Sequence, residues 1–154
     1  MDKHSLPVTL ESSLICESHV LDVTTSNLTA INILTSINIA INNPSKLTQK
    51  PYVTPFKHCL ATIWRPNENS KLPCNGFSII KGYDQDNKLF ASAKSQISLP
   101  SKEGTAIAVC VMDRIQLTDH DGFLTYKVFF CADDNVENEI EYTKHRLYVR
   151  FNGS

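Results

Sequence analysis

The sequence has few of the features by which enzymes and metal proteins are usually recognised. Its 154 residues include only five glycines, too few for a phosphate-binding loop or a flexible linker. The five cysteines are widely spaced and none forms a CxxC pair, which excludes a zinc knuckle and a thioredoxin-like motif. The chain has no G-x-S-x-G, P-loop, G-x-G-x-x-G or H-E-x-x-H motif. None of these motifs therefore indicates a catalytic or metal-binding function.

Long apolar runs and an excess of one charge are missing too. The first twenty residues hold no apolar run of signal-peptide length, and no window approaches the roughly 20 apolar residues of a transmembrane helix. The formal net charge is −1 at pH 7, so there is no whole-chain field to attract nucleic acid or an anionic membrane. We predict one soluble domain with no nucleic-acid partner, no cofactor and no evident small-molecule substrate.

The cysteines favour a simple interpretation. Free cysteine behaves as a small hydrophobic residue, so we expect five buried, inert thiols at positions 16, 59, 74, 110 and 131. The odd count argues against a complete disulfide framework, while a single disulfide in an oxidising compartment stays open as the alternative.

The clearest positive signal lies in residues 30–45. Isoleucine, with one threonine at Thr35, occupies every second position from Ile31 to Ile41, and mostly small or amide residues lie between them. This alternation predicts one long strand with a buried isoleucine face. Pro44 ends it, because proline cannot donate to a strand ladder.

Further strands are expected on both sides of this one. Residues 1–17 are interpreted as a poorly ordered lead-in, and residues 18–154 as the folded domain. The remaining expected strands are 18–24, 56–64, 74–80 (with a glycine typical of an edge or bulge), 88–99, 123–131 and 140–151. The last changes phase, which a bulge between Lys144 and Arg146 would explain. Residues 105–117 fit a short helix or a buried strand, and we favour the helix.

Strands at this spacing, with turns between them, predict an all-β fold: an antiparallel β-sandwich with at most one short helix. A small barrel is the second choice.

Several polar clusters were weighed as sites, and each has a simpler explanation. Cys59 follows His58, so in a strand the two side chains point to opposite faces. The Asp84–Asn87 turn has Leu89 and Ser95 where a calcium loop requires Gly and Glu. The tight turn at residues 119–122 and the acidic stretch 133–141 are expected to be solvated hairpin turns. We predict no catalytic, cofactor-binding or metal-binding residues.

Two glycosylation sequons occur, at Asn27 (Asn27-Leu28-Thr29) and Asn152 (Asn152-Gly153-Ser154). They are candidate acceptors only if the domain faces a secretory lumen.

The order of the short motifs resembles a known family. A turn with Asn27-Leu28-Thr29, a strand closing on Asn43-Pro44, a segment Ala61-Thr62-Ile63-Trp64 and a stretch from Phe77 to Asp86 follow one another. This order is similar to that of the plant LEA-2 domain of NDR1/HIN1-like proteins, the late embryogenesis abundant hydroxyproline-rich glycoprotein family, over roughly residues 20–151. Asn27, Asn43, Pro44 and Trp64 are the residues that carry the resemblance.

The resemblance implies an immunoglobulin- or fibronectin-III-like sandwich, a role in stress or defence responses without catalysis, and association with the plasma membrane. The sequence departs from the family pattern at Arg150, where members carry cysteine, and it shows none of the membrane helix that usually precedes the domain.

Three functional hypotheses follow. The first is a non-enzymatic LEA-2-type domain that acts through protein or membrane-surface contacts. The second is a hydrolase whose Cys or Ser the fold brings beside His58, His120 or His145, which requires a concave pocket around such a pair. The third is a ligand-binding sandwich with Trp64, Tyr83 and Tyr148 as a platform, which requires at least two of these rings exposed on one face.

Overall fold

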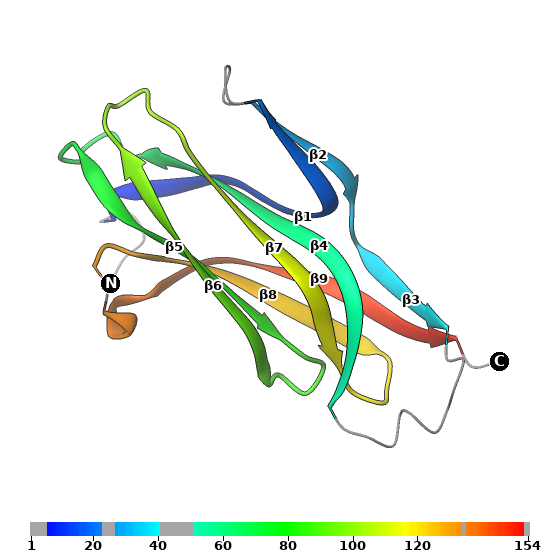
Figure 1. Cartoon of the computed structure of the whole chain (residues 1–154). Coiled ribbons are helices and arrows are strands. Elements are labelled where there is room, and N and C mark those ends of the chain that lie inside the picture. The colour runs from blue at the N-terminus through cyan, green and yellow to red at the C-terminus, as the bar shows by residue number, and fades with distance from the viewer. Residues whose placement is uncertain (1–5, 23–26, 41–50, 134, 153–154) are drawn as a thin grey trace.

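The computed structural model describes residues 6–22, 27–40, 51–133 and 135–152, and this part of the chain forms two packed β-sheets (Figure 1). Sheet A has the order β2-β1-β4-β7 and sheet B the order β3-β9-β8-β5-β6. The strands are β1 (Val8–Asp22), β2 (Asn27–Ile33), β3 (Ser36–Ala40), β4 (Tyr52–Pro66), β5 (Cys74–Tyr83), β6 (Leu89–Leu99), β7 (Ala106–Leu117), β8 (Gly122–Cys131) and β9 (Ile140–Asn152), with a 3₁₀ turn η3 at Val136–Asn138. The predicted all-β sandwich is confirmed. Its strands pair antiparallel except β3 and β9, which are parallel.

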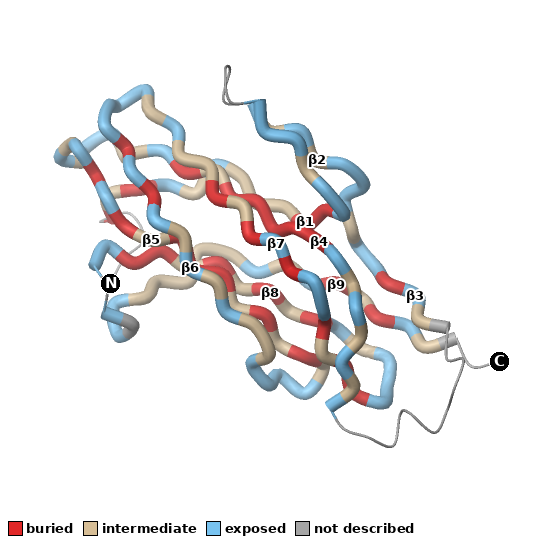
Figure 2. The backbone as a smooth tube through the Cα atoms, in the orientation of Figure 1, coloured by how far each residue is buried: buried red, intermediate tan, exposed pale blue. Residues whose placement is uncertain are grey.

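The core lies between the sheets, where the buried residues gather (Figure 2). On β8 the alternation expected for residues 123–131 is observed, with Leu124, Tyr126 and Val128 all 0% exposed. The indole of Trp64 is also 0% exposed and packs against Phe130 and Tyr142. Fully burying side chains of this size contributes about 1.5–3 kcal/mol each, so the inner face of β8 anchors sheet B to sheet A.

The expectation that residues 1–17 lie outside the fold is wrong from Leu6 onward. β1 begins at Val8, and the side chains of Leu6, Val8 and Ile15 are buried. Two features hide this strand in the sequence. Serines interrupt its apolar pattern, and a bulge between Leu10 and Ser12 shifts its phase. A bulge changes which face the following residues occupy, so a fixed period of two misses β1.

The predicted long strand of residues 30–45 is also wrong in part. β2 pairs with β1 in sheet A and β3 pairs with β9 in sheet B, so the chain changes sheets between Ile33 and Ser36. Asn32 has a φ of 55°, a conformation that asparagine tolerates better than most residues. Ile31 and Ile33 are 41% and 67% exposed. Neither β2 nor β3 is an inner strand, and residues 41–50, with Asn43 and Pro44, lie outside the described residues.

Three smaller expectations can be compared. The helix favoured for residues 105–117 is wrong, since residues 106–117 form strand β7. Ala108, Cys110 and Met112 face the core, and Ile107 and Val109 are half-buried on the other face, as in a strand covered on both sides. The bulge in β9 exists, but the extra residue is Tyr142, as Val128 pairs with Thr143 and Phe129 with Glu141. β5 lies between β8 and β6 and is not an edge strand.

Candidate functional site

Three pairs of hydrogen-bonded side chains cross the core from a strand of one sheet to a strand of the other. His58 on β4 and Tyr126 on β8 are both 0% exposed, and the Tyr126 hydroxyl lies 2.8 Å from His58 Nε2. Nδ1 of the same ring lies 3.0 Å from the Phe56 carbonyl, which can only accept. Nδ1 therefore carries the proton, and Nε2 accepts from the tyrosine. Burial lowers the pKa of His58, so the imidazole is held neutral.

The other two contacts also join one sheet to the other. Ser13 on β1 is hydrogen-bonded to His145 Nε2 on β9. Thr62 on β4 lies 3.2 Å from the Ser78 hydroxyl on β5 and accepts from the Trp64 indole at 3.0 Å. Burial lowers the pKa of His145 as well. Satisfied polar pairs in a core fix the relative position of the elements that they join, and we assign that role to these contacts.

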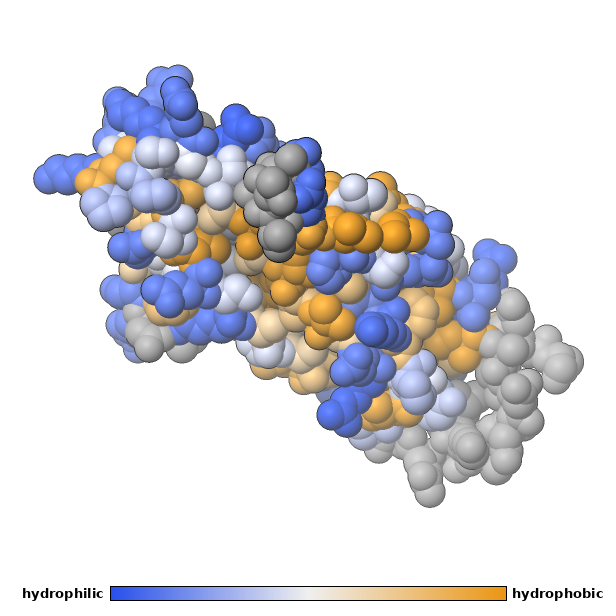
Figure 3. Space-filling view, turned by 45° about the horizontal axis from the view of Figure 1, so that its top comes forward, coloured by the Kyte–Doolittle hydropathy of each residue, from blue (hydrophilic) through white to orange (hydrophobic). Residues whose placement is uncertain are grey.

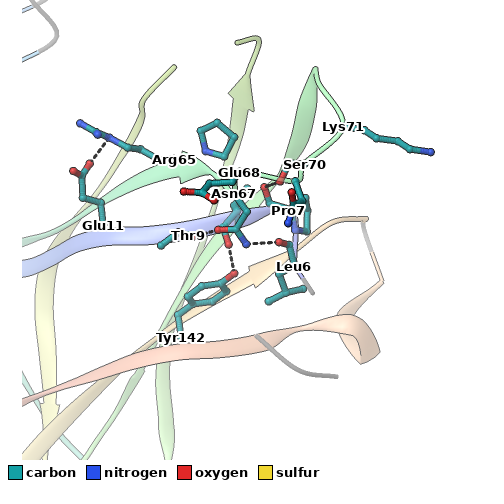
Figure 4. A pocket seen from close by; sticks show the side chains of 13 residues that line it. Leu6, Pro7, Thr9, Glu11, Arg65, Asn67, Glu68, Ser70, Lys71 and Tyr142 are labelled. Carbon is teal, nitrogen blue, oxygen red and sulfur yellow. Dashed lines mark hydrogen bonds and ion pairs between the residues drawn. The ribbon is translucent and has the colours of Figure 1, made fainter. Parts of the chain in front are cut away.

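An open hollow of about 1010 Å³ lies at one end of the sandwich, between the start of β1 and the β4–β5 loop (Figure 4). Several polar groups of its wall bind one another. Asn67 Nδ2 donates to the Leu6 carbonyl at 2.5 Å, and the Ser70 hydroxyl donates to the Pro7 carbonyl at 2.5 Å. Tyr142 donates to the Val8 carbonyl at 2.5 Å. These bonds hold the N-terminal segment against the loop and against β9. We therefore assign the polar groups that make them a structural role.

The histidines named in the hydrolase hypothesis lie apart from one another. His58 is in the core, His145 reaches Ser13 across the sheets, and His120 lies 3.1 Å from the Thr118 hydroxyl in an exposed turn. None of the described residues that line the hollow of Figure 4 is a histidine. Sequence reasoning did not identify the pairing of Ser13 with His145, because Ser13 was assigned to the lead-in. Nor did it identify the contact of His19 Nδ1 with Cys59 Sγ at 3.4 Å.

The carboxylates of the acidic turns accept hydrogen bonds from backbone amides of the same turns. Asp84 is 3% exposed, and its carboxylate accepts from the Asp86 and Lys88 amides at 3.0 and 2.8 Å and from Gln116 at 3.1 Å. Asp133 accepts from the amide of Asn135, which lowers the pKa of the aspartate. In the described part of the chain, no group of three His, Cys, Asp or Glu residues is arranged to hold a metal ion.

The five cysteines are free and buried, as the sequence predicted. Two of them, Cys16 on β1 and Cys59 on β4, are direct cross-strand partners. Burial raises the pKa of both thiols, which favours the protonated form over the reactive thiolate.

The residues that carry the family resemblance lie in different places. Asn27 is exposed at the first position of β2, where a glycan would have access. Asn152 is the last residue of β9. Trp64 is fully buried and so cannot belong to a ligand platform. Tyr83 and Tyr148 are half-buried.

The surface feature that sequence reasoning missed is the end of the β1–β2 hairpin. The last partner pair between β1 and β4 is Cys16 with Cys59, beyond which β1 pairs with β2 alone. We call residues 18–22 and 27–33 the β1–β2 ribbon. It carries four large exposed apolar side chains, Val20, Leu21, Ile31 and Ile33, at 55%, 41%, 41% and 67% exposure.

The ribbon lies over the outer face of sheet A. Leu28 of the ribbon lines a hollow of about 340 Å³ together with Ile63 of β4 and Ile107 of β7. His19 reaches Cys59, which points away from the core because its neighbour His58 points into it. A hydrophobic area bordered by hydrophilic side chains is visible from this side (Figure 3). A two-stranded ribbon is marginally stable alone in water, so contact with the outer face of sheet A or with a partner would stabilise it.

No helix in the described residues is both long enough and apolar enough to span a bilayer. No protein-family model matches the chain, and no curated protein matches it as a relative.

Proposed function

We propose that this protein is a non-enzymatic β-sandwich module of the LEA-2, NDR1/HIN1-like type that acts in plant stress or defence responses through contacts with a protein or a membrane surface. The order of the motifs from Asn27 to Trp64 supports the family. The two-sheet all-β architecture is compatible with the sandwich that the resemblance implies.

The observation that carries the contact role is the apolar β1–β2 ribbon. Large exposed apolar patches on a soluble domain mark interaction sites. Four of the large apolar side chains that are most exposed in the described residues lie on this ribbon, and Ile33 is the most exposed of them at 67%. Partner contact over the ribbon would remove this surface from water.

The test replaces Ile31→Glu and Ile33→Glu together. A matched control replaces Val53→Glu and Leu89→Glu, two apolar residues at 48% and 54% exposure outside the ribbon. In plants lacking the endogenous protein, we expect the control to restore the stress or defence response and the ribbon variant to fail, with both variants folded by circular dichroism. Equal rescue by both variants would contradict the proposal.

The pairing of Ser13 with His145 favours one second candidate, a hydrolase. A serine nucleophile needs a histidine base within hydrogen-bond reach and a third group that orients the base. In the described residues, no hydrogen bond joins a carboxylate to His145. An ester-hydrolysis screen on the full chain and on Ser13→Ala separates the two functions. Activity that disappears in Ser13→Ala would support the hydrolase.

A further inference from the structure

The outer face of sheet B carries three lysines side by side on neighbouring strands. Lys81 on β5 is the direct partner of Lys127 on β8, and Lys127 is the direct partner of Lys144 on β9. Tyr126 and Val128, on either side of Lys127, are buried between the sheets, so this lysine row faces outward. Like charges directly opposite one another destabilise a sheet. The row therefore costs stability unless carboxylates or a bound partner offset the repulsion.

Aromatic rings border the row, and cations lie over them. The cation-to-centroid distances are 5.1 Å for Lys81 over Phe129, 5.5 Å for Lys127 over Tyr83, 5.7 Å for Arg146 over Phe123 and 4.0 Å for Lys94 over Phe77. Phe123 is 46% exposed. Aromatic rings next to Lys and Arg are typical of protein surfaces that lie at a membrane interface.

Carboxylates balance this face only in part. Glu139 is paired with Lys81, with the two side chains 10% and 19% exposed, and Glu141 lies 3.0 Å from Lys127. Lys144, Arg146 and Arg150 of β9 extend the same face and are exposed. In the described residues, Lys81, Lys127 and these three cations share the surface with the carboxylates of Glu139 and Glu141, although the whole chain has a formal net charge of −1. The whole-chain charge conceals a local positive surface.

We propose that the outer face of sheet B docks on an anionic membrane surface, with lipid phosphates against the lysine row and Arg146 and with Phe123 at the headgroup level. The inference rests on the proposed contact function, since it assigns the membrane to this face and leaves the β1–β2 ribbon to a protein. The attraction follows from charge complementarity, because basic side chains near an anionic leaflet each add to binding. A single-stranded nucleic acid fits less well, because its bases need open ring faces and the cations already cover these rings.

The experiment is vesicle sedimentation with the full chain, comparing phosphatidylcholine vesicles with vesicles that also contain phosphatidylserine. The test variant is Lys144→Glu with Arg146→Glu. The matched control is Lys71→Glu with Lys102→Glu, which changes the net charge equally at exposed loop positions off this face. Loss of two basic contacts predicts a partition coefficient lower by at least roughly 30-fold for the test variant. The control should bind as the wild type does, and added salt should release both.

Each outcome decides the proposal. Selective binding of wild type and control to phosphatidylserine, lost in the test variant, supports it. Equal binding to both kinds of vesicle, or equal loss in test and control variants, overturns it. A single-stranded oligonucleotide that binds as tightly as the anionic vesicles overturns it in favour of a nucleic-acid surface. If vesicle binding fails while Ile31→Glu with Ile33→Glu still abolishes plant rescue, the proposed function stands without the membrane face. If the membrane face holds and the ribbon variant rescues, the ribbon's role fails instead.

Discussion

Replacing Tyr126→Phe tests the polar contacts between the sheets most sharply. The ring stays in place, so no cavity forms, and only the hydroxyl that donates to His58 Nε2 at 2.8 Å is lost. Both residues are 0% exposed, and water cannot replace the lost donor. Leaving a buried acceptor without its partner costs about 1–3 kcal/mol. For a chain of this length, that lowers the melting temperature by roughly 2–4 °C per kcal/mol.

Urea unfolding followed by Trp64 fluorescence is the assay, because this tryptophan is the only one in the chain and is 0% exposed. The control is Tyr142→Phe, whose hydroxyl donates to the Val8 carbonyl in a partly buried position. An ordinary hydrogen bond of that kind contributes about 0.5–1.5 kcal/mol. Adding His58→Leu to Tyr126→Phe removes the orphaned acceptor and should recover part of the loss. A Tyr126→Phe variant no less stable than Tyr142→Phe would refute the reasoning.

Three further predictions concern the buried histidines, the buried thiols and the carboxylate of Asp84. Burial lowers the pKa of His58 and His145, so the unfolded chain takes up protons first as the pH falls below about 6.5. The free energy of unfolding should therefore fall from about pH 6.5 to about pH 5, and a flat profile over this range would contradict this. Burial raises the pKa of all five thiols, so a thiol reagent should react slowly with the native chain and rapidly with all five after denaturation; fast reaction of any native thiol would count against their burial. Asp84→Ala removes three hydrogen bonds to a nearly buried carboxylate and should cost about 2–3 kcal/mol by urea unfolding, while Asp86→Ala, an exposed neighbour, should cost far less.

The sequence predicts a strand correctly where buried and exposed residues alternate along its whole length. β8 keeps its alternation through Leu124, Tyr126 and Val128, because a strand with one face in the core repeats every second residue. β1 was missed because its bulge and serines break that period. The isoleucines of residues 31–39 alternate through a change of sheet, and alternation does not say which sheet a strand joins. β7 was ambiguous because apolar residues occupy both of its faces.

The β1–β2 ribbon and the lysine row could not be predicted from the sequence, because both depend on how distant strands pair. Ile31 and Ile33 have the composition of a core face, and only the departure of the ribbon from β4 after Cys59 exposes them. The lysine row contains residues 81, 127 and 144, which are brought together only by the register of β8 with β5 and with β9. Pairing between distant strands is not encoded in local periodicity. The predicted absence of catalytic, cofactor and metal residues stays a prediction.

The most direct test of the proposed contact function is site-specific photo-crosslinking in cells that express the chain, with the photoreactive residue at position 33 or, in a matched chain, at position 53. Both side chains are exposed, at 67% and 48%, but only Ile33 lies on the β1–β2 ribbon. We expect a defined crosslinked product from position 33, absent from position 53 and lost when Ile31→Glu is added. Equal labelling from the two positions, or none from position 33, would contradict it.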